Sequence, residues 1–398
     1  FIILLPINAL GAYLQIFAYE LGASPEIIGV LLAIPFIFSM IARFAGGYLA
    51  DVLGRKPVVT YTYLLGVVTY SIFIMATSWV YLIPFQILSG LIFLSQAAEA
   101  SLMSESLPAE KRSTGMTLTQ LPSALGLILG PILASIVYTR TKNVIITCKV
   151  FGEFLIFGYF LSFLIRLILI QETKPPEERP SFSAFISGYK SVFSDVFNKL
   201  KAPLFVDIAI FMMFGFVMFT QLFAVQYLGI DPEIWGYLLA LLSIFVIVGG
   251  IPGMIIGDKK GRVLSFKIAT LLAFIGFPFI AFAKELAHNF EGVNIWFITL
   301  NPVETVLFLA GIIVAISYGM ANSVAGAYIT ELFNPEVRGK GVTVFLFFGD
   351  IGLIIGFILS GFVYQNIDPR AVYVIASVIM LISFIVCFKL PETLRKEG

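Results

Sequence analysis

Long apolar stretches separated by short polar breaks run along the whole chain. Twelve of these stretches are long enough to cross a bilayer, because a spanning helix needs about 20 mostly apolar residues. The expected spans are residues 1–21, 26–50, 57–77, 80–104, 115–138, 144–170, 203–228, 233–256, 263–283, 303–330, 342–364 and 371–390. The strands of a membrane barrel would be shorter and would alternate in polarity. The pattern therefore predicts an all-α membrane protein with twelve transmembrane helices.

Composition supports a membrane protein and excludes several other classes. Apolar residues make up 59% of the 398 residues and charged residues only 12%, whereas a soluble domain has about 25% charged residues. The net charge of +1 provides no basic surface for nucleic acid. Cys148 and Cys387 both lie in apolar runs, so we expect neither a disulfide nor a metal site. The chain starts with Phe1 inside an apolar run, so we expect that a short segment precedes it.

Chemical motifs of enzymes are missing from the sequence. It contains no nucleophile–base pattern and no glycine-rich phosphate-binding motif of the kind that binds ATP. We therefore expect neither an enzyme nor an ATP-driven pump, and no cofactor.

Lysine and arginine are concentrated on one face of the predicted membrane domain. We call it the linker face, because it carries the polar stretch 171–202. Its loops and helix ends hold eighteen basic residues, and the opposite face holds four. Basic residues mark the cytoplasmic side, so we expect a plasma-membrane protein with the linker and both termini in the cytoplasm. Within the linker, apolar residues at helical spacing over 182–200 predict an amphipathic helix on the membrane surface. We interpret it as a tether rather than a regulatory docking site.

The chain contains an internal repeat. Residues 21–55 match residues 228–262 at a shift of 207, and residues 105–138 match residues 331–364 at a shift of 226. Six spans return the chain to the same side, so both copies have the same orientation. We predict an N-terminal six-helix bundle (1–170), the linker (171–202) and a C-terminal six-helix bundle (203–398). Parallel repeats of this kind are typical of transporters, whose site lies between the halves near the bilayer midplane. A channel is the alternative, but no filter sequence is present.

Two loops on the linker face carry the same charged signature. Residues 47–56 read GYLADVLGRK, and residues 253–262 read GMIIGDKKGR. This signature resembles the characteristic loop of the major facilitator superfamily, with one extra residue in the second copy. Four further segments are similar to that superfamily, namely 105–112, 331–341, 172–173 and 391–393. The resemblance covers the whole chain and implies the major facilitator fold.

The resemblance also implies a gate at the linker face. Asp51 would face the positive N-terminus of the eleventh helix, and by symmetry Asp258 would face the fifth. Such contacts would favour the state that is closed on this face. The other expected latch residues are Arg55, Glu105, Arg112, Arg262, Glu331 and Arg338. The alternative is that these charges only set the topology and solvate the loops.

Polar side chains on the first, fourth, seventh and tenth helices are candidates for binding substrate, because the resemblance places these helices at the centre of the fold. They are Tyr13, Gln15, Tyr19, Gln86, Gln96, Gln221, Gln226, Tyr318 and Asn322. Gln96 and Asn322 are repeat mates at the shift of 226, which suits a site on the axis that relates the halves. The alternative for each is a hydrogen bond between helices.

Two carboxylates inside predicted spans are candidates for carrying a proton. Glu99 continues a polar stripe of the fourth span, and Asp350 lies in an apolar run of the eleventh. Ionisable groups inside the membrane are costly and are functional candidates by default. The alternative is an ion pair with an arginine from a neighbouring helix. Gln86 stands where proton antiporters of the superfamily have an arginine, so their usual proton-transfer residue is missing.

Two further patterns inside the spans have structural interpretations. The spacing of Gly126 and Gly130 resembles part of an antiporter motif, but its repetition at Gly352 and Gly356 is typical of close helix packing. Lys149 and Glu153, four residues apart on one helix, are expected to neutralise each other.

The resemblance implies a secondary active transporter that moves a small organic solute by alternating access, driven by protons. Residues 19–57 are most similar to drug-efflux members, so we expect an antiporter that exports drug-like or lipophilic compounds. Segments 331–341 and 391–393 are similar to sugar porters, and proton-coupled uptake of a sugar or another polar solute is the alternative. A transporter-like receptor or sensor without flux would have the same sequence. We expect a monomer in the bilayer.

Overall fold

The computed structural model describes residues 2–106, 118, 121–172, 182–295, 298–334 and 337–394, without the side chains of 104, 182–188 and 191. It divides into two compact units, Phe1–Gly188 and Tyr189–Gly398. We call them the first and second halves and describe each by itself. The division falls inside the predicted linker, and the predicted boundaries 1–170, 171–202 and 203–398 stay a prediction.

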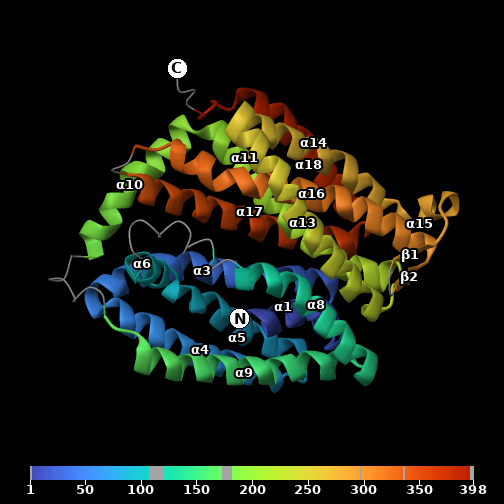
Figure 1. Ribbon diagram of the computed structural model, residues 1–398, viewed down its shortest axis with the longest axis horizontal. Helices are drawn as coiled ribbons and strands as arrows, with labels where there is room; N and C mark the ends of the chain where they lie inside the picture. The colour runs from blue at the N-terminus through green and yellow to red at the C-terminus, as the bar shows by residue number, and fades with distance from the viewer. Residues whose placement is uncertain are drawn as a thin grey trace. The chain divides into compact units, whose positions relative to one another are not determined.

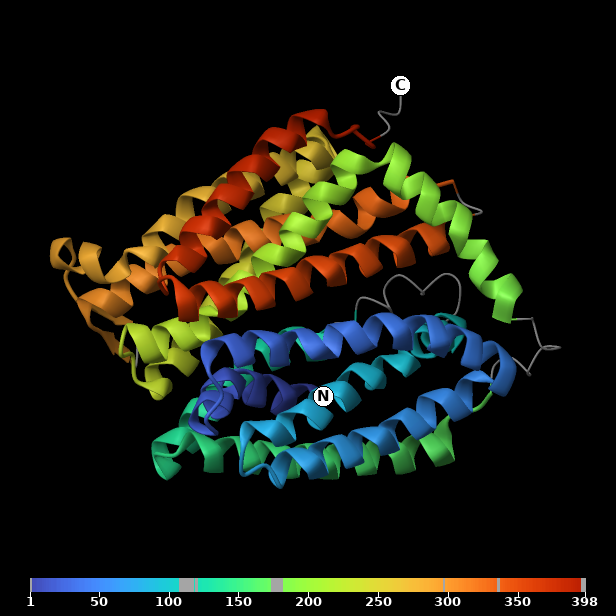
Figure 2. The same cartoon turned by 180° about the vertical axis from the view of Figure 1, so that it is seen from behind.

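The first half consists of helices that pack lengthwise. α1 lies along α8, α3 along α5, and α4 along α9, as both views show (Figures 1 and 2). The elements are α1 (Leu4–Gly11), α2 (Leu14–Glu20), α3 (Pro25–Leu53), α4 (Arg55–Ile74), η1 (Trp79–Tyr81), α5 (Leu82–Leu91), η2 (Ile92–Ser95), α6 (Gln96–Ser106), α8 (Leu121–Thr141) and α9 (Val144–Leu169).

The second half repeats this arrangement and adds an amphipathic helix and a small hairpin. Its closest helix pairs are α13 with α16, α11 with α17, and α14 with both α16 and α18 (Figure 1). The elements are α10 (Phe182–Lys199, which begins in the first half), α11 (Lys201–Met218), α12 (Thr220–Leu222), η4 (Phe223–Tyr227), α13 (Pro232–Lys260), α14 (Arg262–Ala281), α15 (Ala283–Leu286), η5 (Ala287–Asn289), β1 (Val293–Ile295), β2 (Ile298–Leu300), α16 (Pro302–Glu331), α17 (Arg338–Asn366), α18 (Ala371–Val386) and η6 (Cys387–Lys389).

The predicted all-α membrane fold is confirmed. Among the described residues, eleven helical segments are long and apolar enough to cross a membrane. The first predicted span is also helical, but it is broken into α1 and α2, and each piece is shorter than a span. The polar stretch before α16 contains a hairpin in which β1 and β2 pair antiparallel, with Val293 opposite Leu300. This hairpin is the only sheet in the described part of the chain.

The internal repeat is visible in the helix boundaries. α3 and α13 both have 29 residues and begin at Pro25 and Pro232, and α4 and α14 both have 20 residues. Proline favours the first helical position, where its missing N–H costs no hydrogen bond. Gly54 and Gly261 end α3 and α13 with φ of +91° and +115°, a region that glycine enters without steric cost. The sequence shift of 207 therefore gives the same helix–turn–helix unit twice.

Glycines allow α8 and α17 to pack tightly on the first helix of their own half. A Cβ atom on Gly130 would lie 2.8 Å from the backbone nitrogen of Ala9 in α1. A Cβ atom on Gly356 would lie 2.7 Å from the carbonyl oxygen of Met212 in α11. Small residues let helix backbones approach closely in a membrane protein. The packing interpretation of this glycine spacing is confirmed in both halves.

The amphipathic helix α10 is docked on protein. Val192 and Val196 on its apolar face are buried in a hydrophobic cluster with Leu204 of α11 and with Val344 and Phe345 of α17. The prediction that this face lies on the membrane surface is therefore wrong for the part after residue 188. Amphipathic spacing shows that a helix has an apolar face but not which apolar partner covers it.

Candidate functional site

The first helix of each half is broken at the same position of the repeat. α1 ends at Gly11 and α11 ends at Met218, and these residues are related by the shift of 207. In the second half the chain continues through the short α12 and the π-helical turn η4. Such turns in helices are frequent at functional sites. Interrupted helices at corresponding positions of two halves are typical of transporter substrate sites.

Aromatic contacts support both breaks in the same way. Tyr13 lies in the first break, and its ring centroid is 5.8 Å from that of Tyr138 in α8. Phe219 lies in the second break, and its ring centroid is 5.8 Å from that of Tyr364 in α17. Tyr138 and Tyr364 are themselves repeat mates at the shift of 226. The breaks are thus built into the packing of each half.

Four of the predicted substrate residues are buried. Tyr13 is fully buried, and its hydroxyl lies 3.3 Å from that of Ser135 in α8. Gln15, Gln86 and Gln221 are at most 5% exposed. In this structure these four side chains serve the packing of the helices more directly than the binding of a solute.

Four other predicted residues are exposed, and they form two pairs of repeat mates. Tyr19 and Gln226 correspond at the shift of 207, and Gln96 and Asn322 correspond at the shift of 226. All four are neutral hydrogen-bonding groups. Each half therefore presents one such side chain from its first helix and one from its fourth.

Neighbouring side chains hold Gln96 and Asn322 in defined positions. Arg43 of α3 donates a hydrogen bond from Nε to the amide oxygen of Gln96 at 3.0 Å. Asn322 shares a hydrogen bond with the hydroxyl of Tyr318, whose ring stacks on Phe214 of α11 with centroids 5.2 Å apart. Tyr318, the ninth predicted substrate residue, is half-buried. Two polar positions of the repeat are thus oriented by different partners in the two halves.

The linker-face signature of the first half forms a local network. Arg55 at the start of α4 pairs with Glu105 near the end of α6. The carboxylate of Glu172 accepts hydrogen bonds from the backbone N–H groups of Arg55 at 3.2 Å and Lys56 at 3.0 Å. These N–H groups have no partner inside the helix, so Glu172 caps α4 and also complements the positive end of its dipole.

The second half repeats this network. Arg262 pairs with Asp258 of α13 and with Glu331 of α16, at 3.2 Å from Nη2 to Oε1 of the latter. The carboxylate of Glu392 accepts hydrogen bonds from the backbone N–H groups of Arg262 at 2.9 Å and Val263 at 3.2 Å. The capping role of Glu172 and Glu392 was not predicted, although both follow the last helix of their half in a Glu-Thr pair.

The other predicted gate residues lie apart from these networks. Asp51 lies near the end of α3 and is half-buried. Arg338 begins α17, is exposed, and has no ion pair within the described ranges. Arg112 lies outside the described residues. The structure thus brings together Arg55 with Glu105 and Arg262 with Glu331, each pair inside one half.

Among the predicted proton carriers, Glu99 has a charged partner. Its carboxylate lies 3.4 Å from the guanidinium of Arg166 in α9, which in turn donates a hydrogen bond to the hydroxyl of Tyr63 at 2.6 Å. The ion-pair alternative is therefore confirmed for Glu99. Asp350 lies in the apolar part of α17 and is 2% exposed.

The predicted pair of Lys149 and Glu153 on α9 is wrong. Among the described residues these two side chains form no ion pair, and Glu153 is exposed. Spacing of four residues permits such a contact without imposing it, and an exposed pair gains little free energy because water screens it.

An ionic cluster closes the opposite face of the second half. Arg370 lies 2.8 Å from both Asp368 in the turn after α17 and Glu285 in α15. Hydrogen bonds from Arg370 hold the pKa of Asp368 below its ordinary value. Because Glu285 comes from a separate element, the cluster ties the turn between α17 and α18 to α15.

Comparison with protein families gives a match over the whole chain. The family model described as the Major Facilitator Superfamily matches residues 1–298 and 292–398. A curated relative is the uncharacterized MFS-type transporter YqjV of Bacillus subtilis (strain 168). It is 21% identical over 345 residues, which cover 83% of this chain and 74% of the relative.

Solved structures with a similar fold are also transporters. The crystal structure of the nucleoside transporter NupG has a TM-score of 0.73 at 16% identity, covering 98% of this chain and 97% of NupG. A D-xylose-proton symporter has a TM-score of 0.72 at 15% identity, with coverage of 98% and 97%. The peptide transporter POT in complex with sulfate has a TM-score of 0.74 at 16% identity, with coverage of 98% and 92%. These identities show a common fold and leave the solute open.

Proposed function

The chain belongs to the major facilitator superfamily, and on that premise we propose that it moves a small organic solute across the membrane by alternating access coupled to protons. It is a multi-pass membrane transporter and not an enzyme, as the family and its structural neighbours are. We place the linker face and both termini in the cytoplasm and the protein in the plasma membrane as a monomer. The excess of basic residues on the linker face supports this orientation.

The observation that carries the proposal is the matched break in the first helix of each half. A break frees backbone hydrogen-bonding groups inside the membrane, where an unpaired group is costly unless it is buried in protein or lines a cavity. Retaining such a break at the same repeat position in both halves supports a functional role. We propose that Tyr19, Gln96, Gln226 and Asn322, together with Tyr318, contact the solute.

Two classes of solute fit these residues. The similarity of residues 19–57 to drug-efflux members supports export of drug-like or lipophilic compounds. The exposed amides of Gln96, Gln226 and Asn322 support a second candidate, uptake of a polar neutral solute, since amides both donate and accept directed hydrogen bonds. NupG is named as a nucleoside transporter, and the symporter of similar fold is named for D-xylose.

Proton coupling needs a carboxylate that changes its charge during transport. Glu99 already has Arg166 as a counter-ion, which stabilises its charged form. Asp350 is almost fully buried in α17, where a charge is expensive. We therefore assign the coupling role to Asp350 before Glu99.

A binding screen followed by a flux assay tests the proposal. The purified protein is unfolded thermally in detergent at two pH values with D-xylose, uridine, dialanine or tetraphenylphosphonium. A ligand present at about 100 times its Kd stabilises the folded state by about 2.7 kcal/mol. A stabilising compound is then assayed in proteoliposomes with an imposed pH gradient.

We expect the bound compound to move in response to the pH gradient, and Gln226→Ala and Asn322→Ala to weaken its binding. Stabilisation by tetraphenylphosphonium with extrusion supports export, whereas stabilisation by D-xylose or uridine with accumulation supports polar-solute uptake. Binding without any flux would contradict the proposal and favour a receptor.

A further inference from the structure

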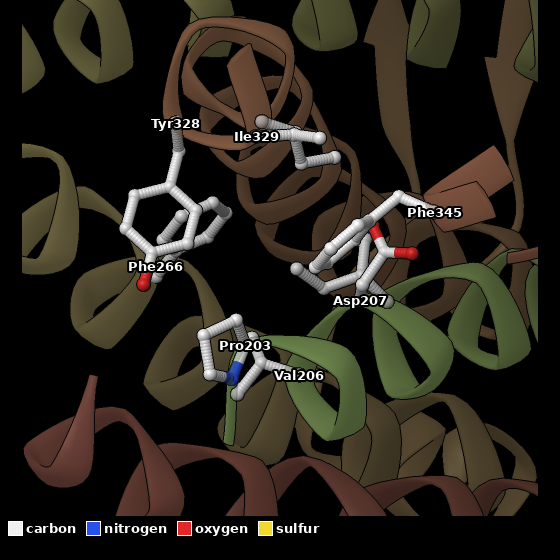
Figure 3. Close-up of a pocket in the computed structure, with 9 residues that line it drawn as sticks. Pro203, Val206, Asp207, Phe266, Tyr328, Ile329 and Phe345 are labelled. Carbon is white, nitrogen blue, oxygen red and sulfur yellow. The ribbon is translucent and has the colours of Figure 1, made fainter. Parts of the chain in front are cut away.

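A small cavity lies inside the second half, close to the linker face (Figure 3). Its walls come from the first two turns of α11, α14 and α17 and from the last two turns of α16. Its volume is about 10 Å³ for a water-sized sphere, which is the room that one water molecule needs. An organic solute does not fit there, so this cavity is separate from the proposed solute-binding residues.

The lining is apolar except for two side chains, Asp207 of α11 and Tyr328 of α16. Asp207 is 7% exposed and Tyr328 is 3% exposed. Oδ2 of Asp207 and the hydroxyl of Tyr328 are buried and have no hydrogen-bond partner within the described part of the chain. Asp207 also forms no ion pair with any described residue.

The surroundings of Asp207 offer nothing that stabilises a negative charge. In Figure 3 its carboxylate lies beside the ring of Phe345, and the ring of Tyr328 lies beside that of Phe266. Of the helices around it, α14 and α17 contribute only apolar residues to the cavity, α16 contributes one titratable group, Tyr328, and α18 and η6 contribute none. Burying an ionised carboxylate without a partner costs far more than burying the neutral acid.

A metal cation fits this cavity poorly. Hard cations bind several oxygen ligands at once, whereas the side chains here provide only one carboxylate and one hydroxyl. A proton needs only the carboxylate, and the room for one water beside it gives the proton a route in and out. The donor set therefore selects a proton.

We propose that Asp207 is a proton-binding residue that exchanges its proton with the linker face of the second half. The proposal deepens the proton coupling put forward above and rests on it for its role in transport, but the protonation of Asp207 stands on the cavity itself. Asp350, the coupling residue already assigned, lies further along α17 than Phe345, so the second half would carry two proton-binding carboxylates.

Ionisation of Asp207 has a structural consequence for α10. Phe345 and Ile329 line the cavity and also contact the cluster that buries Val192 and Val196. A charged Asp207 draws water into the cavity, and this hydration loosens the packing of the shared side chains. The docking of α10 on α17 should therefore weaken when Asp207 loses its proton.

Infrared difference spectroscopy of the full chain in lipid nanodiscs tests the protonation directly. Spectra are recorded between about pH 5 and about pH 9, above the ordinary pKa of an aspartate. We expect a carboxylic-acid C=O band that disappears as the pH rises and that Asp207→Asn removes. Asp195→Asn is the matched control, because Asp195 in α10 is an exposed carboxylate paired with Lys199; it should leave the band unchanged.

Hydrogen exchange of the α10 amides tests the consequence. After correction for the intrinsic pH dependence of exchange, protection of α10 should fall at least several-fold across the Asp207 transition in the wild type. It should stay constant in Asp207→Asn, which is neutral at every pH. If that variant does not fold, Tyr328→Phe replaces it: removing the hydroxyl makes the cavity less polar and should move the band's disappearance to higher pH.

Several outcomes would overturn the proposal. They are a spectrum that Asp207→Asn leaves unchanged, a band whose pH dependence Tyr328→Phe does not alter, or a titration that sodium displaces in an Asp207-dependent manner. A band assigned to Asp207 in a protein that shows no proton-driven flux would refute the proposed function and leave the protonation site intact.

Discussion

Removal of the carboxylate at position 392 should destabilise the second half by a predictable amount. Glu392 accepts two backbone hydrogen bonds at the start of α14, at 2.9 Å and 3.2 Å. Losing a helix cap costs about 0.5–2 kcal/mol, and losing the charge at a helix N-terminus costs about 0.3–1 kcal/mol at an exposed site. Because Glu392 is exposed and screened by salt, we expect Glu392→Ala to lower the stability by about 1–2 kcal/mol.

Thermal unfolding in detergent, followed by circular dichroism, measures this effect. For a unit of about 200 residues, 1 kcal/mol corresponds to a change in Tm of about 2–4 °C. Glu392→Gln keeps an acceptor oxygen without the charge and should lose less than half as much. Glu172→Ala is the matched variant in the first half and should behave like Glu392→Ala. Glu291→Ala, an exposed carboxylate in the polar stretch before β1, is the control that should not change Tm.

The salt dependence separates the two contributions. Screening removes the charge–dipole part and leaves the hydrogen bonds, because the Debye length falls from about 10 Å at 0.1 M to about 3 Å at 1 M salt. The difference between Glu392→Gln and the wild type should therefore shrink at high salt, and most of the Glu392→Ala effect should stay. An unchanged Tm in Glu392→Ala at both salt concentrations would refute the capping role.

Three further predictions concern packing, coupling and pH. Gly130→Ala places a methyl group against the backbone of α1 and should cost about 1–3 kcal/mol by thermal unfolding; Gly11→Ala, where no atom lies within 4 Å, should cost less than 0.5 kcal/mol, about the limit for a surface change. Asp350→Asn should abolish pH-driven flux in proteoliposomes while solute binding persists, and flux that persists would contradict its role. Because Arg370 lowers the pKa of Asp368 in the folded state, this contribution to stability is present above the pKa of an unfolded aspartate and is lost as the pH falls through the folded value. Arg370→Ala should remove that part of the acid sensitivity measured by Tm against pH, and an unaltered profile would count against the pair.

The helices of the fold were largely predictable, because the length and apolar content of a span are local properties of the sequence. The repeat was predictable for the same reason, and the structure reproduces it to the residue in α3 and α13. The break between α1 and α2 was not. Gly11 is the only local signal for it, and glycine also occurs inside unbroken helices such as α17.

Contacts that depend on a second element were harder to predict. The sequence marked α10 as amphipathic, but the partner of its apolar face is set by the tertiary position of Phe345 and Val344. Glu99 was equally open to a proton or an arginine until the position of Arg166 was known. The capping carboxylates Glu172 and Glu392 are distant in sequence from the helices whose first N–H groups they accept.

Departures from the repeat separate function from scaffold in this chain. The networks at Arg55 and Arg262 occur in both halves, so one local fold explains both. The Asp207 cavity does not recur: the repeat mates of its wall residues Phe266 and Tyr328 are Val59 and Leu102, which are buried in an apolar cluster of the first half. Packing alone would favour that apolar solution in both copies, since a buried polar group without a partner lowers stability. A polar pair retained in one copy at a cost in stability is therefore evidence for a role that the second half alone performs.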